Sequence, residues 1–146
     1  MIPQFNSAGL LPPGVHWADW EELEARFAGN PWRQRLMQGF RAAIENLRDS
    51  GCRTVYLNGS FVTSKTHPND YDACWEEAGV DPTGLDPVLL TFDAGRAAQK
   101  AKYLGELFPA SITADAEGLS FLEFFQTDKE TGRPKGITAI DMEGLA

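Results

Sequence analysis

The stretch LNGSFVTSKTHPNDYDACW, residues 57–75, joins two segments of strand-forming composition through a polar linker. The first segment ends in the pair Gly59-Ser60, and the second begins with two aspartates, Asp70 and Asp72, on either side of a tyrosine. Residues i and i+2 of a strand point to the same face of a sheet, so both carboxylates are expected on one face. Like charges held this close repel each other unless a cation lies between them. The pattern therefore favours a cation-binding role for this stretch.

The segments around this stretch predict the fold class. Residues 30–51, NPWRQRLMQGFRAAIENLRDSG, have the clearest helical pattern, because apolar residues recur at spacings of three and four along one face. Asn30 suits the capping position before this helix, and Gly51 suits the left-handed position after it. The expected elements are helices over 18–29 and 30–51, strands over 52–60 and 70–75, a helix from Ala97, and strands over 119–126 and 136–142. This order predicts an α+β fold, with a small mixed β-sheet flanked by helices.

The length of 146 residues favours one folded domain. Residues 1–16 contain three prolines and two glycines without a helical or strand period, so we expect an extended N-terminal arm there. Residues 17–146 are then expected to form the domain. No apolar run approaches the roughly 20 residues of a membrane-spanning helix, and the first residues lack the pattern of a signal peptide. These features predict a cytoplasmic protein without a membrane contact.

Net charge and cysteine content argue against several classes of protein. The formal net charge of −8 disfavours broad, nonspecific binding to nucleic acid, although a local RNA contact or a small phosphate-bearing ligand remains compatible with it. Cys52 and Cys74 are the two cysteines, and their spacing indicates neither a disulfide framework nor a zinc site. The Gly-Ser and aspartate stretch is therefore the strongest candidate for a functional site.

The residue types in this stretch suit a phosphate and a divalent cation. Gly59 permits the close approach of a phosphate because it has no Cβ, and the Ser60 hydroxyl and nearby N–H groups can hold phosphate oxygens. Asp70 and Asp72 would project together from the next strand, with Tyr71 facing the core. Mg²⁺ usually takes one or two protein carboxylates together with substrate phosphates. These residues together predict a site for a nucleotide and a magnesium ion.

GSFVTSKTHPNDYD, residues 59–72, resembles the signature of the nucleotidyltransferase superfamily, the polymerase-β-like fold, in which a Gly-Ser pair precedes Asp-x-Asp or Asp-x-Glu. The linker of nine residues between Ser60 and Asp70 is at the short end for that family. The size of the chain resembles that of the minimal nucleotidyltransferases, several of which act as antitoxins. The chain is also similar to a group of small bacterial and phage proteins that share the LPPGVHW arm, the YLNGSFVT strand and the FFQ and TGRPKGI segments. The resemblance implies a minimal nucleotidyltransferase-like fold.

The same resemblance implies a third carboxylate on a later strand, as a metal ligand or general base. Glu123 is the first candidate, because the apolar residues around it in FLEFFQ predict a buried strand, and Asp141 is the second. An aspartate is commoner at this position of the family, so a glutamate departs from the pattern. Lys65 in the linker is expected to reach a triphosphate, unless it is simply a mobile loop residue. The implied metal ligands and catalytic residues are therefore Asp70, Asp72 and Glu123, with Gly59, Ser60 and Lys65 on the nucleotide.

The function that this resemblance implies is Mg²⁺-dependent (or Mn²⁺-dependent) transfer of a nucleoside monophosphate from an NTP to a protein or RNA hydroxyl, in a toxin–antitoxin or phage-defence setting. Arg96 and Lys100, four apart on a predicted helix, would contact phosphates or the acceptor. The chain has no evident separate domain for the nucleotide base. A homodimer or a partner protein such as a toxin would then complete the cleft.

The alternative hypothesis is a catalytically inactive binding module with the same fold, such as an antitoxin or a phage accessory protein that acts by protein contact. The aspartate pair also has a purely structural interpretation, in which Asp70 caps a turn and Asp72 lies exposed on an edge strand. The acidic surface and the N-terminal region with Trp17 and Trp20 suit the docking of a partner. Binding of ATP with Mg²⁺ distinguishes the two hypotheses, because the enzyme requires it and the contact module does not.

Overall fold

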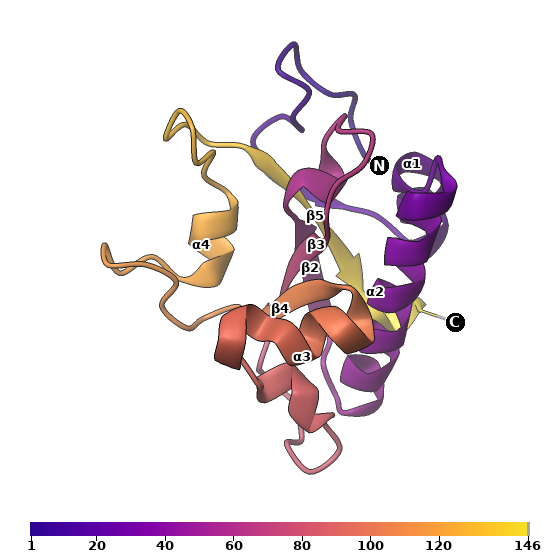
Figure 1. Cartoon of the computed structure of the whole chain (residues 1–146), viewed down its shortest axis with the longest axis vertical. Helices are drawn as coiled ribbons and strands as arrows, with labels where there is room; N and C mark the ends of the chain where they lie inside the picture. Colours follow the sequence, from indigo (N-terminus) through magenta and orange to yellow (C-terminus); the bar gives the residue numbers. More distant parts are fainter. Residues whose placement is uncertain (146) are drawn as a thin grey trace.

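The computed structural model of the chain describes residues 1–145 and contains one β-sheet with helices on both of its faces (Figure 1). The strands are β1 (Gly14–Trp17), β2 (Thr54–Asn58), β3 (Tyr71–Trp75), β4 (Gly105–Pro109) and β5 (Gly136–Asp141). The helices are α1 (Trp20–Phe27), α2 (Pro31–Asp49), α3 (Asp93–Tyr103) and α4 (Phe121–Phe125). Short 3₁₀ helices cover Ser60–Val62, Pro87–Leu90 and Met142–Gly144.

The sheet is mixed, with the strand order β1-β5-β2-β3-β4. The central strand β2 is antiparallel to both of its neighbours, whereas the two outer pairs, β1 with β5 and β3 with β4, are parallel. The predicted α+β class with a small mixed sheet is therefore confirmed. No helix in residues 1–145 has the length and apolar character needed to cross a membrane.

Helix α2 forms where its sequence pattern predicts it. The Asn30 side chain accepts a hydrogen bond from the Arg33 backbone N–H, Pro31 is the first helical residue, and Gly51 has a φ of +101° after the helix ends. These are the features that begin and end a stable helix. One face of α2 is fully buried against the sheet, through Leu36, Phe40, Ile44 and Leu47. Burial of this stripe fixes the helix on the sheet.

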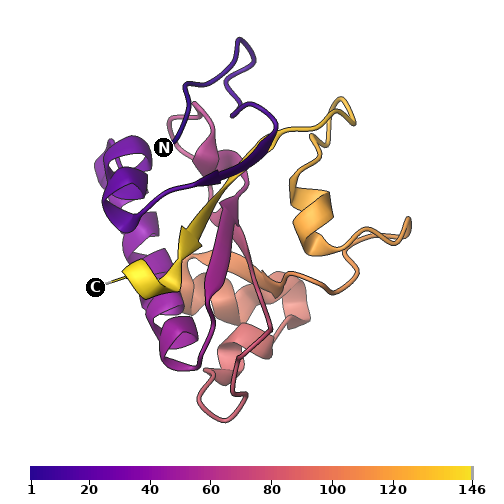
Figure 2. The same ribbon diagram turned by 180° about the vertical axis from the view of Figure 1, so that it is seen from behind.

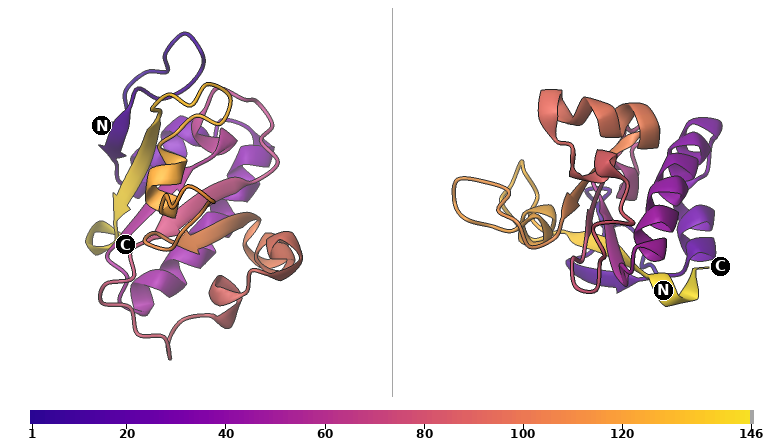
Figure 3. Two further views of the ribbon diagram at one scale, coloured as in Figure 1. Left: turned by 90° about the vertical axis from the view of Figure 1, so that its left-hand side faces the viewer. Right: turned by 90° about the horizontal axis from the view of Figure 1, so that it is seen from below.

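The two faces of the sheet have separate hydrophobic cores. The larger core lies under α1 and α2, and it takes Val55 and Leu57 from β2 (Figure 3). Tyr56, between them, belongs to a smaller core on the opposite face, where α4 packs. Tyr71 at the start of β3 is fully buried in the larger core, as the sequence predicts. The alternation of side chains therefore determines which residues face α4.

The smaller core is aromatic, and it shows that the strand predicted over 119–126 is wrong. This segment forms the five-residue helix α4, whose Phe121 ring stacks on Phe108 of β4 with 4.0 Å between ring centroids. Ser120 and Glu123 form a reciprocal capping box, with each side chain bonded to the other residue's backbone N–H. This local hydrogen bonding outweighs the β-propensity of the phenylalanines. Two strands were not predicted from the sequence, β4 over Gly105–Pro109 and the edge strand β1 over Gly14–Trp17.

The N-terminal region is part of the sheet. Gly14–Trp17 pairs in parallel with β5 at the sheet edge, and Leu11 is buried in the larger core (Figure 2). The boundary expected between residues 16 and 17 therefore falls inside β1, and the extended arm is shorter than predicted. A four-residue edge strand after two prolines has too short a pattern for sequence periodicity to reveal it.

Arg33 of α2 holds the linker that follows the Gly-Ser pair. Its buried guanidinium donates hydrogen bonds to the carbonyls of Phe61 at 2.7 Å, Thr63 at 3.0 Å and Lys65 at 2.6 Å, and also to that of Phe27 at 2.9 Å. A guanidinium offers five N–H donors in a fixed plane, which suits several carbonyls at once. The linker therefore follows a defined path across the end of α2.

Candidate functional site

Three polar residues lie next to one another across the middle of the sheet. Asn58 of β2 pairs with Asp72 of β3, and Asp72 pairs with Glu106 of β4. All three face the α4 side, because the residues two positions along each strand belong to the aromatic core, namely Tyr56, Cys74 and Phe108. Asn58 is almost fully buried, while Asp72 and Glu106 are partly exposed. The sheet therefore gathers two carboxylates and an amide at one end of its α4 face.

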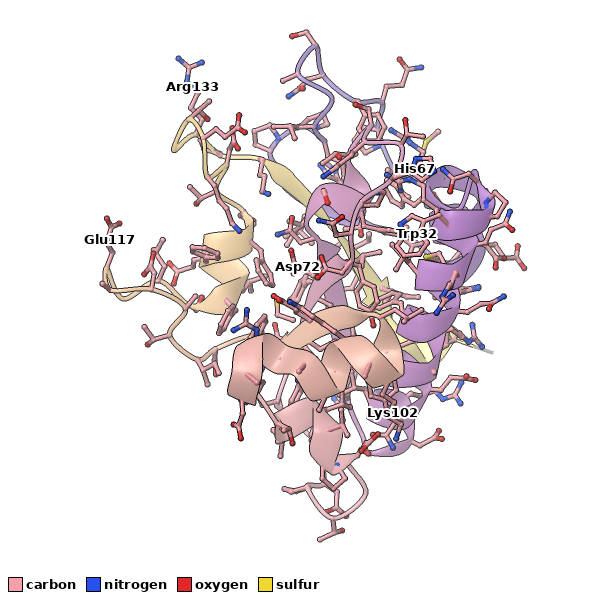
Figure 4. The ribbon with its side chains drawn as sticks, in the orientation of Figure 1. Trp32, His67, Asp72, Lys102, Glu117 and Arg133 are labelled. Carbon is pink, nitrogen blue, oxygen red and sulfur yellow. The ribbon has the colours of Figure 1, made fainter. Side chains whose placement is uncertain are left out.

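A pocket opens beside Asp72, between the sheet and the segment that runs from α4 to β5. Figure 4 shows Asp72 in the space between the central strands and α4. The sheet side of the pocket is formed by Asn58, Gly59, Ser60, Thr63 and Asp72. The opposite side is formed by Phe124, Phe125, Thr127, Asp128, Lys129, Glu130 and Lys135. The Gly-Ser pair and the second aspartate of the sequence motif thus share one pocket.

Gly59 is needed for the conformation of this pocket. Its φ of +82° and ψ of −168° lie in a region that is essentially restricted to glycine. A Cβ on residue 59 would lie 2.5 Å from Oδ2 of Asp72. The glycine therefore permits both the turn and the close approach of the Asp72 carboxylate.

Replacing Gly59 with alanine is expected to lower the free energy of unfolding by about 3 kcal/mol, because the backbone is strained and the Asp72 carboxylate must move. Gly132→Ala is the matched control. Gly132 also has a positive φ, of +71°, but a Cβ there would meet nothing within 4 Å, so about 1 kcal/mol is expected. Chemical denaturation measures both values. Equal losses for the two variants would contradict the contact between Gly59 and Asp72.

Burial and neighbouring carboxylates change the acidity of both aspartates. Burial, followed by the charges of Asp70 and Glu106, raises the pKa of Asp72 to about 7. Burial and then the charge of Glu106 raise the pKa of Asp70 as well. A nearby cation stabilises the ionised form of such a carboxyl group, because it offsets both the loss of solvation and the repulsion by neighbouring carboxylates. The pair is therefore electrostatically suited to a bound cation.

The pKa of Glu106 is lowered, in contrast to those of Asp70 and Asp72. Burial alone would raise its pKa, but hydrogen bonds from Lys100 and Arg96 lower it. The Lys100 ammonium lies 3.0 Å from Oε1 of Glu106, and the Arg96 guanidinium lies 3.1 Å from the same oxygen. Glu106 therefore stays ionised beside Asp72. We refer to Asp70, Asp72 and Glu106 as the acidic cluster.

Asp70 and Asp72 open onto different hollows. Asp70 directly precedes β3 and lines a second hollow together with Trp32, Arg35, Asn69 and Lys100. Asp72 lines the pocket under α4. The two carboxylates nevertheless interact, because the charge of Asp70 contributes to the raised pKa of Asp72. The acidic cluster thus lies between two hollows on the surface.

Neither predicted third carboxylate lies in the pocket. Glu123 is exposed on α4, and its carboxylate accepts hydrogen bonds from the Ser120 N–H at 3.1 Å and the Ser120 hydroxyl at 3.0 Å. Asp141 pairs with Thr54, which places it at the opposite end of β2 from Asn58. Glu123 therefore caps a helix, and Asp141 lies at the far end of the sheet.

Lys65 also lies outside the pocket lining. Its side chain is exposed, and its carbonyl is one of those that Arg33 holds. The lysines of the pocket are Lys129 and Lys135, which come from the segment between α4 and β5. A contact of Lys65 with a triphosphate stays a prediction, while Lys129 and Lys135 are the lysines that the structure places beside the Gly-Ser pair.

Sequence reasoning missed Glu106, Asn58 and Lys135. Glu106 stands in GELFP, a short run with one acidic residue between a helix and apolar residues. The same pattern, a glutamate beside apolar residues, favoured Glu123 in FLEFFQ, and in GELFP it also indicates a glutamate on a buried strand. Asn58 and Lys135 carry no signal of their own, since their position depends on the pairing of β2 with its neighbours.

The residues of the acidic cluster fit a divalent cation without forming a complete ligand shell. Within residues 1–145, no three His, Cys, Asp or Glu side chains form a ready group of metal ligands. Mg²⁺ does not require one, because it usually keeps water and substrate oxygens beside one or two carboxylates. Asn58 adds a further oxygen: its Oδ1 is buried without a hydrogen-bond partner in residues 1–145. The donor set of oxygens alone suits Mg²⁺ or Mn²⁺.

Comparison with known proteins gives one family. The family model described as "Family of unknown function (DUF6932)" matches residues 3–141. The match includes all five strands and the acidic cluster. No curated protein and no solved structure matches the chain.

Proposed function

We propose that this chain, which belongs to the DUF6932 family, is a nucleotidyltransferase that uses Mg²⁺ or Mn²⁺ to transfer a nucleoside monophosphate from an NTP to an acceptor hydroxyl. One observation carries the proposal: the pairing of β2 with β3 places Gly59 and Ser60 in the same pocket as Asp72, and the pairing of β3 with β4 sets Glu106 beside Asp72. The Gly-Ser pair and the Glu106 carboxylate are thus both neighbours of Asp72. This arrangement supports a nucleotide site with a third carboxylate on β4.

The proposed reaction assigns a role to each group. The acceptor oxygen forms a bond to the α-phosphorus, the bond from that phosphorus to the bridging oxygen breaks, and pyrophosphate leaves. The acceptor proton passes to a carboxylate of the acidic cluster. Gly59 lets the phosphates approach the backbone, and the Ser60 hydroxyl donates to a phosphate oxygen.

Asp72 and Glu106 would hold the cation, with Asp70 beside them. When bound, Mg²⁺ neutralises charge on the phosphates and lowers the barrier to displacement. Arg96 and Lys100 keep the Glu106 carboxylate ionised and in position, rather than contacting the phosphates directly. Glu106 thereby takes the role that the sequence analysis gave to Glu123.

The acceptor in this proposal is a protein or RNA hydroxyl, in a toxin–antitoxin or phage-defence setting. The hollow that contains Asp70 lies on the other side of the acidic cluster from the Ser60 pocket and provides room for an acceptor. A second copy of the chain or a partner such as a toxin would complete the cleft around it. These assignments rest on the proposed reaction.

Transfer of a labelled nucleotide tests the proposal. Purified protein with Mg²⁺ and α-labelled NTP is expected to label itself or an added acceptor, and the double variant Asp70→Asn, Asp72→Asn is expected to lose the labelling. The variant keeps the volume of both side chains and removes their charge. Labelling that persists in the double variant would remove the assignment.

Calorimetry with ATP and Mg²⁺ tests the contact-module alternative. Trp17 favours that alternative, because half of its side-chain surface is exposed at the edge strand β1. Binding of the nucleotide is expected for the enzyme. The absence of binding at millimolar nucleotide would favour a module that acts by protein contact.

A further inference from the structure

The segment from α4 to β5 forms a hairpin over the pocket. Thr127 pairs with Pro134, the Asp128 N–H donates to the Arg133 carbonyl at 2.8 Å, and the Lys135 N–H donates to the Gln126 carbonyl at 2.8 Å. We call residues 127–135 the cover hairpin. Its backbone bonds give it a defined shape, and the hairpin places Lys129 and Lys135 in the pocket lining.

Lys135 directly precedes β5 and lies on the α4 side of the sheet. Ile137 and Ala139 of β5 belong to the aromatic core, so the alternation of the strand places Lys135 on the same α4 side of the sheet. β2 and β5 are paired up to Leu57 and Thr138, so Ser60, which follows β2, and Lys135, which precedes β5, lie at the same end of the sheet. Both residues line the pocket beside Asp72.

The charge of Lys135 is unpaired. Its side chain is only partly exposed, yet within residues 1–145 its ammonium has no ion pair or hydrogen bond. Burial lowers the pKa of Lys135, while the charges of Asp128 and Asp72 raise it at longer range. A partly desolvated ammonium without a partner is costly, and an anionic ligand removes that cost.

The acidic side chains of the cover hairpin do not provide that partner. The Asp128 carboxylate is used inside the hairpin, where it accepts from the Thr131 hydroxyl at 2.8 Å and the Glu130 N–H at 3.3 Å. Glu130 is exposed. On the sheet side, the buried Asn58 Oδ1 also lacks a partner among residues 1–145. The pocket thus has two unpartnered polar groups, one cationic and one neutral, on opposite walls.

We propose that Lys135 binds the terminal phosphates of the nucleotide, so that this pocket is a polyphosphate subsite with the cover hairpin as one wall. This inference rests on the proposed function for the identity of the nucleotide, but the subsite itself binds a polyphosphate whether or not transfer follows. The phosphates lie between the Ser60 hydroxyl and the Lys135 ammonium. The role predicted for Lys65 therefore belongs to a lysine 70 residues later in the chain.

Inorganic tripolyphosphate with Mg²⁺ is the probe, measured by calorimetry in 150 mM salt with the full chain. Wild-type protein is expected to bind it, Lys135→Gln is expected to weaken binding by about ten- to a hundredfold, and Lys135→Arg is expected to retain most of the affinity. Arg133→Gln is the matched control. It removes the same charge from the same hairpin, but Arg133 points away from the pocket into solvent, so its affinity is expected to stay within about twofold (Figure 4).

The outcomes separate this inference from the proposed function. Equal affinity of Lys135→Gln and wild type, or no binding by wild type, would overturn the polyphosphate subsite. Lys135-dependent binding without any nucleotidyl transfer would support the subsite and overturn the enzyme. Thermal unfolding of each variant shows whether Lys135 merely balances the charge of Asp72: a lower melting temperature with unchanged affinity would assign it that structural role and reject the subsite.

Discussion

Glu106→Gln is expected to lower the rate of nucleotidyl transfer by about a hundredfold or more, whereas Glu123→Gln is expected to leave the rate within about twofold. Both variants replace a glutamate with an amide of the same shape. Glu106 pairs with Asp72 across β3 and β4, so the change removes a charge from the acidic cluster. Glu123 caps α4, and glutamine suits the same capping position.

Single-turnover transfer of labelled nucleotide measures both rates at saturating Mg²⁺. The unfolding free energies of the two variants serve as the control, since a folded Glu106→Gln protein is needed for the comparison. A large loss in Glu123→Gln, or full activity in Glu106→Gln, would restore Glu123 as the third carboxylate and contradict the site described above.

Asp72→Asn is expected to abolish transfer and at the same time to stabilise the metal-free protein at pH 8, by about 2 kcal/mol. The reason is the environment of the carboxyl group: burial and the charges of Asp70 and Glu106 raise the pKa of Asp72 to about 7. Keeping that group ionised in the folded state costs free energy. An asparagine removes the charge and its cost, and it also removes the proposed ligand of the cation.

The pH dependence has a definite sign. The pKa of Asp72 is raised on folding from its ordinary value of 3.8 to about 7, so the folded state holds the proton more tightly than the unfolded state. Between about pH 4 and pH 7 the contribution of Asp72 to stability therefore falls as the pH rises, and it is lowest above pH 7. The Asp72→Asn variant has no carboxyl group at this position, so its stability lacks this dependence on pH. The stability gain of the variant is thus expected to be small at pH 4.5 and largest at pH 8.

Urea denaturation in EDTA at several pH values measures this difference. Asp81→Asn is a control, because Asp81 is exposed and hydrogen bonds from the Thr83 N–H and hydroxyl lower its pKa, the opposite direction from Asp72. Its stability difference from wild type is expected to show no rise between pH 4.5 and pH 8. A stability loss in Asp72→Asn at pH 8 would show that the Asp72 carboxylate has a structural partner.

The sequence was most informative where the signal was local. The cap at Asn30, the glycine at position 51 and the apolar stripe of α2 all formed as predicted, because each depends on residues within a few positions of one another. The Gly-Ser and Asp-x-Asp motif likewise determined its own strand–turn–strand context and the inward position of Tyr71. Local patterns therefore predicted the part of the fold that surrounds the motif.

The rest of the site depends on pairing between distant segments. Glu106 lies beside Asp72 because β4 is parallel to β3, and Lys135 reaches the pocket because β5 is antiparallel to β2. The phenylalanines of FLEFFQ suit either a strand or a buried helix, and the capping box decides between them. The sequence pattern of one segment carries no information about which strand will lie beside it. For this reason the sequence alone did not place Glu106 beside Asp72.

The bonds from Arg33 to the carbonyls of Phe61, Thr63 and Lys65 have a consequence for the kinetics with which the proposed nucleotide would bind. They order the backbone after Ser60 during folding. The conformational entropy of this loop is therefore lost on folding, and binding of the ligand does not have to reduce it further. A loop that is shaped in advance needs no slow rearrangement once the nucleotide arrives. The rate of encounter is then governed by diffusion and by the charge of the pocket walls, rather than by the opening and closing of the linker.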